Sequence, residues 1–131
     1  MKRFLLALMA ASAMTASASA SANLDCSAQD KNVAGLTIEA ITSRDGKYLA
    51  SLRGELQLAS GAKISFERSD VKSYNWGKNV ALVLTKQTAQ GPIEVRVYAK
   101  PKPDDDIELE GTYVVITGKT KVSGKVQCSG G

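Results

Sequence analysis

Two cysteines, Cys26 and Cys128, are the most reactive side chains in this sequence, which contains no histidine. A lipid anchor on Cys26 would require a small residue directly before it and an apolar residue three positions before it. Asp25 and Asn23 occupy those positions. Thiols of exported proteins are usually paired, because the compartment is oxidising. We therefore predict a disulfide between Cys26 and Cys128, which must bring the two ends of the domain within about 7 Å (Cα to Cα).

The absence of histidine removes Ser-His-Asp and Cys-His catalysis and the commonest ligand of zinc, copper and iron. No nucleophile-elbow, dinucleotide-binding or phosphate-binding glycine motif is present. The carboxylates of Glu39, Glu55, Glu67 and Asp70 fall in outward-facing positions or turns, whereas acid/base catalysis usually needs partly buried carboxylates. We predict that the protein is not an enzyme and uses no cofactor.

The acidic stretch KPKPDDDIELE, Lys100 to Glu110, is the most unusual segment in composition. Asp104, Asp106 and Glu108 could offer alternating oxygen ligands to calcium, but their spacing lacks the glycine and glutamate of an EF-hand loop. A Lys-Pro-Lys-Pro connector followed by solvated acidic residues explains the segment more simply. No metal site is predicted.

The segment SYNWGKN, Ser73 to Asn79, holds the only tryptophan and is expected to be the longest loop. Tyr74 and Trp76, flanked by Lys72 and Lys78, are predicted to form a contact patch for a protein or a glycan, because exposed aromatic residues favour such contacts. The alternative, which the small size of the domain favours, is that Trp76 folds inward and closes one end of it.

Three lysines, Lys119, Lys121 and Lys125, are expected to project outward from the last strand. They could attract anionic surface polymers. The simpler interpretation is that they prevent edge-to-edge pairing of a terminal strand.

The first 22 residues have the pattern of a secretory signal: Lys2 and Arg3, a short apolar stretch, and then alternating serine and alanine. Cleavage is expected after Ala20 or, preferably, after Ala22, so residues 1–22 are assigned to the signal and 23–131 to a single domain. The domain keeps 15 basic and 13 acidic residues, a net charge of +2. This small excess and the predicted export to the periplasm or the medium argue against a nucleic-acid partner. No later segment is apolar enough for membrane insertion.

Alternation of apolar and polar residues dominates the rest of the chain and predicts β-strands. We expect strands at roughly 36–43, 47–59, 62–68, 79–87, 92–100, 107–117 and 119–128, with a short one near 24–27. A loop at 44–46 would place Ile38 opposite Leu52, and a turn at 60–62 would place Leu56 opposite Phe66. A two-residue turn at Gly118 and Lys119 pairs Tyr113 with Gly124 and Leu109 with Cys128.

These features predict an all-β domain, a small antiparallel up-and-down barrel of about 7–8 strands closed by the disulfide; a two-sheet sandwich is the alternative. Its inward side chains are mostly aliphatic and of medium size: Ile38, Ala40, Leu52, Leu56, Leu58, Ile64, Phe66, Leu82, Leu84, Val95, Val97 and Val115. Such a set could fill a barrel of this size.

The sequence therefore favours an exported binding module that contacts a protein or an envelope polymer through one end of the barrel. Inhibition of an extracytoplasmic protein is one form of this function. The alternative is a lipocalin-like carrier of a small apolar ligand, which would require an internal cavity of about 300 Å³ or more.

Overall fold

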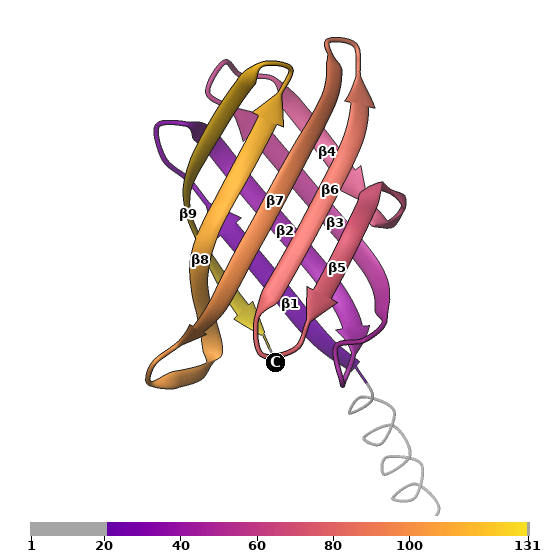
Figure 1. Ribbon diagram of the computed structural model, residues 1–131, viewed down its shortest axis with the longest axis vertical. Coiled ribbons are helices and arrows are strands. Elements are labelled where there is room, and N and C mark those ends of the chain that lie inside the picture. The colour runs from indigo at the N-terminus through magenta and orange to yellow at the C-terminus, as the bar shows by residue number, and fades with distance from the viewer. Residues whose placement is uncertain (1–20, 131) are drawn as a thin grey trace, which may run out of the picture.

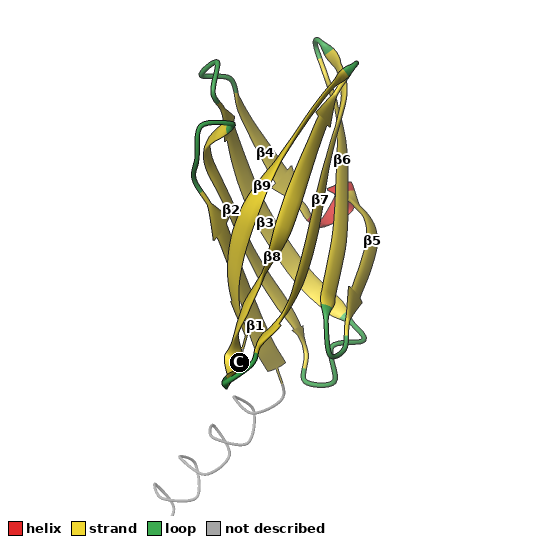
Figure 2. Cartoon of the chain, turned by 60° about the vertical axis from the view of Figure 1, so that its left-hand side comes forward, coloured by secondary structure: helices red, strands yellow, loops and turns green. Residues whose placement is uncertain are grey.

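The computed structural model describes residues 21–130, which form a nearly closed, nine-stranded antiparallel barrel (Figures 1 and 2). The neighbouring strands follow the order β4-β3-β2-β1-β9-β8-β7-β6-β5. The predicted all-β barrel is confirmed, with slightly more strands than expected.

The strands are connected mostly by short turns. Their bounds are β1 (Ser21–Ala28), β2 (Val33–Ser43), β3 (Leu49–Leu58), β4 (Lys63–Glu67), β5 (Val71–Trp76), β6 (Val80–Thr88), β7 (Gly91–Lys102), β8 (Asp105–Thr117) and β9 (Thr120–Gly130), with a short 3₁₀ helix η1 (Arg68–Asp70) between β4 and β5. In Figure 1 the connections 29–32, 59–62, 89–90 and 118–119 lie at the upper end, and 44–48, 77–79 and 103–104 lie at the lower end.

The two terminal strands pair with each other, because β1 lies between β2 and β9. Cys26 pairs with Cys128 in this ladder, and their sulfur atoms form the predicted disulfide across a sequence separation of 102 residues. The disulfide prediction is confirmed.

Strand β1 begins at Ser21, and its first two residues, Ser21 and Ala22, pair with Ser43 and Thr42 of β2. Cleavage after Ala20 would leave this strand whole, whereas cleavage after Ala22 would shorten it by two residues. Residues 1–20 of the predicted signal lie outside the described part of the chain, and the cleavage site stays a prediction.

The remaining opening of the barrel lies between β4 and β5, which follow each other along the chain. β4 pairs only with the upper half of β3, at Arg53 to Gln57. After η1 the chain changes partner, and β5 pairs with the lower half of β6, from Val80 to Leu84. This long segment therefore crosses the opening diagonally (Figure 2).

The predicted register of the last hairpin is confirmed: Val115 lies opposite Val122, Tyr113 opposite Gly124, and Leu109 opposite Cys128. Gly118, with φ of 56°, allows the tight turn.

The predicted registers of the first two hairpins are wrong by two residues. Ile38 pairs with Gly54 rather than Leu52, because the first loop is longer and a bulge follows it between Ile41 and Thr42. Leu56 pairs with Ile64 rather than Phe66, because Gly61 takes the last position of its loop, not the middle one.

Each register is displaced by two residues, an even number, so the same side chains of both strands still face inward. All twelve predicted inward side chains belong to the core or pack against it. The register predicted for the first hairpin would also place Tyr48 opposite Thr42 on the inward face; instead Tyr48 is exposed and Leu49 is buried.

Two further strand predictions are corrected. Residues 71–76 form β5 rather than a loop. The last strand, β9, has partners on both sides, so Lys119, Lys121 and Lys125 do not protect a free edge. The free edges belong to β4 and β5.

Candidate functional site

Trp76 lies across the lower end of the barrel. It is the last residue of β5, is partly buried and packs against the core. Its backbone carbonyl oxygen touches the loop at Gly46, and a Cβ atom on Gly130 of β9 would lie 2.7 Å from Trp76 Cζ2. The side chain thus spans from the free edge of β5 to the C-terminal strand. This position matches the alternative in which Trp76 closes one end of the domain.

Tyr74 points into the barrel from the same face of β5, since it pairs with the buried Leu82. Its Oη atom is buried and has no hydrogen-bond partner. The Thr42 hydroxyl lies near Tyr74 Oη and acts to lower the pKa of Tyr74. The two groups do not have the geometry of a hydrogen bond. Burial dominates and raises the pKa of Tyr74 to about 12.

Lys72 and Lys78 do not share this interior position. Lys72 is the additional residue of a bulge between Val71 and Ser73. Its Nζ atom lies on the outer wall, 3.9 Å from Glu94 Oε1. Lys78 is exposed in the connection 77–79 at the lower rim. The four predicted residues are therefore not brought together: Tyr74 and Trp76 face the interior, whereas the two lysines lie on the outer wall and at the lower rim.

The sequence interpretation missed the exposed apolar residues of this end. Four large hydrophobic side chains stand out among the described residues: Tyr48 (65% exposed), Ile107 (57%), Tyr98 (48%) and Ile41 (45%). Tyr48 lies in the lower connection 44–48, and the other three lie near the lower ends of β8, β7 and β2. We refer to these four residues and Trp76 as the lower apolar surface.

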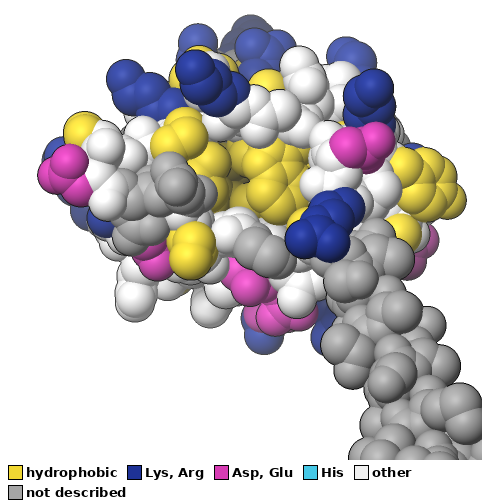
Figure 3. Space-filling view, turned by 90° about the horizontal axis from the view of Figure 1, so that it is seen from below, with side chains coloured by type: hydrophobic (Ala, Val, Ile, Leu, Met, Phe, Trp, Pro, Cys, Tyr) yellow, Lys and Arg dark blue, Asp and Glu magenta, His cyan; other side chains and the backbone are white. Residues whose placement is uncertain are grey.

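Seen from below, hydrophobic side chains occupy the hollow centre of this end and parts of its rim, among both basic and acidic side chains (Figure 3). The exposed basic residues of the lower connections and strand ends include Lys47, Lys78 and Lys100. Exposed acidic residues, among them Asp45 and Asp104, belong to the same connections, so the rim around the lower apolar surface has mixed charge.

The loop that carries Tyr48 is held by its own polar groups. Asp45 Oδ1 accepts hydrogen bonds from Ser43 Oγ at 2.6 Å and from the Lys47 amide at 3.0 Å. The Ser43 hydroxyl bond is the main reason why the pKa of Asp45 lies below its usual value. The Tyr48 amide donates to Ser43 Oγ at 3.0 Å. Tyr48 is thus presented on an ordered loop.

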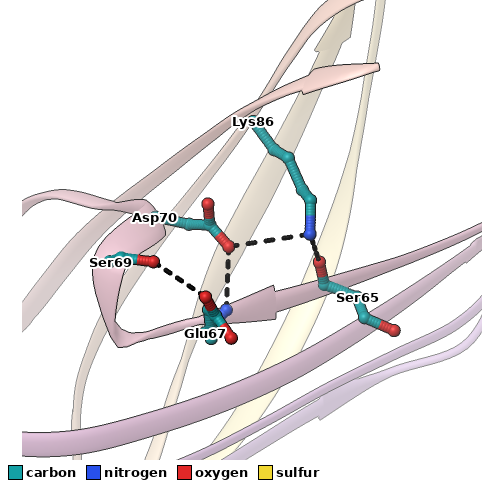
Figure 4. A network of polar contacts seen from close by, with 5 residues as sticks. All are labelled: Ser65, Glu67, Ser69, Asp70 and Lys86. Atoms are coloured by element: carbon teal, nitrogen blue, oxygen red, sulfur yellow. Dashed lines mark hydrogen bonds and ion pairs between the residues drawn. The ribbon is translucent and has the colours of Figure 1, made fainter. Parts of the chain in front are cut away.

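The carboxylates considered for catalysis have structural surroundings. Glu55 forms an ion pair with Lys63 at 3.3 Å on the outer wall, and Glu39 is exposed. Glu67 and Asp70 cap η1, where Asp70 Oδ2 accepts a hydrogen bond from the Glu67 amide at 2.9 Å (Figure 4). The acidic segment near residue 104 is only partly described, because the side chains of Asp105 and Asp106 lie outside the described part.

The upper end contains a different polar cluster. Tyr113 is fully buried, and its Oη donates to the carboxylate of Asp30 at 2.7–2.8 Å. Asp30 also accepts from the amides of Asn32 and Val33, and Asn32 Nδ2 donates to the Ser123 carbonyl. The Tyr113 bond lowers the pKa of Asp30, while burial and then this carboxylate raise the pKa of Tyr113. The cluster fastens the connection 29–32 across the upper end.

Within residues 21–130 no helix is long and apolar enough to cross a membrane. Over the same described residues, no group of three or more histidine, cysteine or acidic side chains could hold a metal ion. No protein-family model, curated protein or solved structure matches this chain.

Proposed function

We propose that this protein is an exported, non-enzymatic interaction module whose lower apolar surface binds another protein. One observation carries the proposal: the exposed large hydrophobic residues of the described chain gather at a single end of the barrel. Exposed apolar side chains that lie at one end of a protein can mark an interaction site, and tyrosine and tryptophan are enriched among residues that dominate binding energy.

The rigidity of this end supports the same function. Tyr48 stands on a loop ordered by Asp45 and Ser43, and Trp76 is held against Gly46 and Gly130. A surface that is already ordered loses little conformational entropy on binding. Tyr98 is also held in place, because its Oη accepts a hydrogen bond from Asn79 Nδ2 at 3.0 Å.

An inhibitor of an extracytoplasmic protein is the form of this function that we favour. A rigid end that carries exposed apolar side chains suits insertion into an apolar cleft of a partner. The disulfide fits an oxidising compartment such as the periplasm or the medium. An anionic envelope polymer would instead bind the lysine side chains of the rim through charge, with little dependence on the apolar residues.

The test compares affinity capture from an envelope extract of the source organism by three proteins. These are the unmodified domain, a Tyr48→Ser/Ile107→Ser double variant at the lower end, and a Gln90→Ser/Lys119→Ser double variant at the upper end. We expect the unmodified domain and the upper-end variant to capture the same amount of the partner. The lower-end variant should capture at least about tenfold less of it. Equal capture by all three would refute the proposal. Loss of binding in high salt, without dependence on Tyr48 and Ile107, would indicate a charged polymer instead.

A further inference from the structure

A pocket of about 630 Å³ lies at the upper end of the barrel, between β4 and the β6–β7 hairpin. It exists because β5 pairs with β6 only as far as Leu84, whereas β6 continues to Thr88. β4 forms its ladder with β3 alone. The upper half of the opening between β4 and β6 is therefore not closed by backbone pairing.

The walls of this pocket are amphipathic. Leu58, Ile64 and Ile93 line it, and they belong to the upper part of the core or pack against it. Exposed polar residues such as Ser60 and Gln87 form the rim toward solvent. The volume lies within the range of about 300–1,000 Å³ that is typical of small-molecule sites.

Lys86 places a positive charge on the inner side of this pocket. The side chains of Val80, Leu82 and Leu84 face the core, and alternation along the strand directs Lys86 to the same side, opposite the buried Ile93. Its Nζ crosses the opening and donates to the Ser65 carbonyl oxygen at 2.6 Å, with Asp70 Oδ2 at 3.9 Å (Figure 4).

The ammonium group of Lys86 retains donor capacity for a ligand. A lysine has three N–H donors, and the Ser65 carbonyl accepts one of them. The side chain is 38% exposed, so an anion can reach it from the rim. A cation beside three apolar side chains is the arrangement that recognises a molecule with an anionic head and a hydrocarbon tail.

We propose that the upper pocket binds a single-chain amphiphile with an anionic head group, such as a medium-chain carboxylate. The head accepts a hydrogen bond from Lys86 Nζ, and the tail contacts Leu58, Ile64 and Ile93. This site is separate from the lower apolar surface and does not depend on the function proposed for it. It also differs from a wholly apolar cavity inside the barrel, because the charge of Lys86 selects the ligand.

The test uses sodium octanoate and the uncharged 1-octanol as probes on the unmodified protein, followed by calorimetry and by the NMR shifts of the Ile64 and Ile93 methyl groups. We expect octanoate to bind and to shift both methyl groups, with 1-octanol binding at least about tenfold more weakly. Absence of octanoate binding, or equal binding of the two probes, would overturn the proposal.

Variants separate ligand binding from the bridge that Lys86 makes to Ser65. Lys86→Gln should weaken octanoate binding about tenfold, whereas Lys86→Arg, which keeps the charge, should stay within about threefold of the unmodified protein. Lys121→Gln on the outer wall is the matched control and should bind as the unmodified protein does. If Lys86→Gln lowers the melting temperature but binds octanoate with unchanged affinity, the role of Lys86 is structural only and the proposal fails.

Discussion

The two buried tyrosine hydroxyls of this barrel have opposite surroundings. Tyr113 Oη donates to Asp30, and Gly124 directly opposite leaves room for both groups, since a Cβ there would lie 2.6 Å from the tyrosine ring. Tyr74 Oη has lost its hydration without gaining a hydrogen bond. We therefore expect Tyr113 to stabilise the fold through its hydroxyl and Tyr74 to stabilise it only through its ring.

Acid should weaken the upper end through Asp30. The pKa of Asp30 in the folded state is below its ordinary value of 3.8, mainly because of the Tyr113 bond, so the carboxylate stabilises the fold above pH 3.8 and this contribution is lost as the pH falls below that value. Melting temperatures measured from pH 6 to pH 2 should fall more steeply for the unmodified protein than for Asp30→Asn. Parallel curves for the two proteins would show that Asp30 contributes nothing.

Alkali should weaken the lower end through Tyr74. Its folded-state pKa of about 12 exceeds the ordinary value of 10.0, so the unfolded chain loses the proton first and stability falls as the pH rises from 10 to 12. Tyr74→Phe should reduce this loss and should be neutral or stabilising by up to about 1 kcal/mol at pH 7. A loss of more than 1 kcal/mol, measured by urea unfolding, would mean that the hydroxyl has a partner.

For the lower end of the barrel, the sequence predicted that aromatic residues would be present but did not predict where their side chains would point. Tyr74 and Trp76 were expected to form an exposed patch with Lys72 and Lys78, but Tyr74 points into the barrel and Lys72 lies on the outer wall. Ile41 and Tyr98 were missed, although both are large apolar residues in the outward phase of their strands, and this signal could have found them. Tyr48 could not be placed, because its direction depends on the bulge beside the loop.

The length of the turn decides whether the register of a hairpin can be predicted from the sequence. The last hairpin has a two-residue turn with glycine at the position of positive φ, and one register satisfies both the turn and the inward pattern. The first hairpin has a longer loop and a bulge, so several registers keep the same inward face. Alternation alone therefore does not distinguish between registers that differ by two residues.

Strand β5 was missed for a related reason. Its sequence, VKSYNW, contains a bulge at Lys72 that interrupts the alternation, and its pairing with β6 requires the chain to leave β3 at η1. Such a change of partner depends on the closure of the whole barrel, and no local pattern encodes it.

Close contact between β7 and β8 gives a test of the strand arrangement. Gly111 pairs with Ala99, and a Cβ on Gly111 would overlap the Tyr98 carbonyl oxygen and lie 2.7 Å from the Ala99 Cα. Gly111→Ala should therefore destabilise the protein by about 3 kcal/mol. Gly35→Ala on β2 is the control, because nothing lies within 4 Å of a Cβ there. Chemical denaturation measures both, and equal stabilities would contradict the described contact.

In the molecule as a whole, the disulfide joins β1 and β9, which are the first and last strands in sequence order. Cys26 and Cys128 face each other in the β1–β9 ladder, so the cross-link restricts almost the entire described chain in the unfolded state. The sequence predicted this closure because two cysteines near the two ends of a domain that follows a secretory signal are expected to pair. It could not predict the opening at β4 and β5, and therefore could not predict the upper pocket.

Removal of the disulfide should lower stability without changing the fold. A Cys26→Ser/Cys128→Ser double variant should lose about 2–5 kcal/mol in urea unfolding while keeping the far-ultraviolet circular dichroism of a β-protein. Mass spectrometry of the non-reduced protein provides the control, since the mature chain should be two hydrogens lighter than its reduced form. A double variant of unchanged stability would show that the ladder alone holds the ends together.

Photo-crosslinking in cells would show whether the whole molecule binds a partner through its lower end. A photoreactive p-benzoylphenylalanine is placed at Tyr48 of the lower apolar surface or, as the control, at Lys119 of the upper end, and cells of the source organism are irradiated. We predict a discrete adduct with one protein from position 48 and none from position 119. An equal adduct from both positions, or an adduct from position 119 alone, would show that the lower end is not the binding surface.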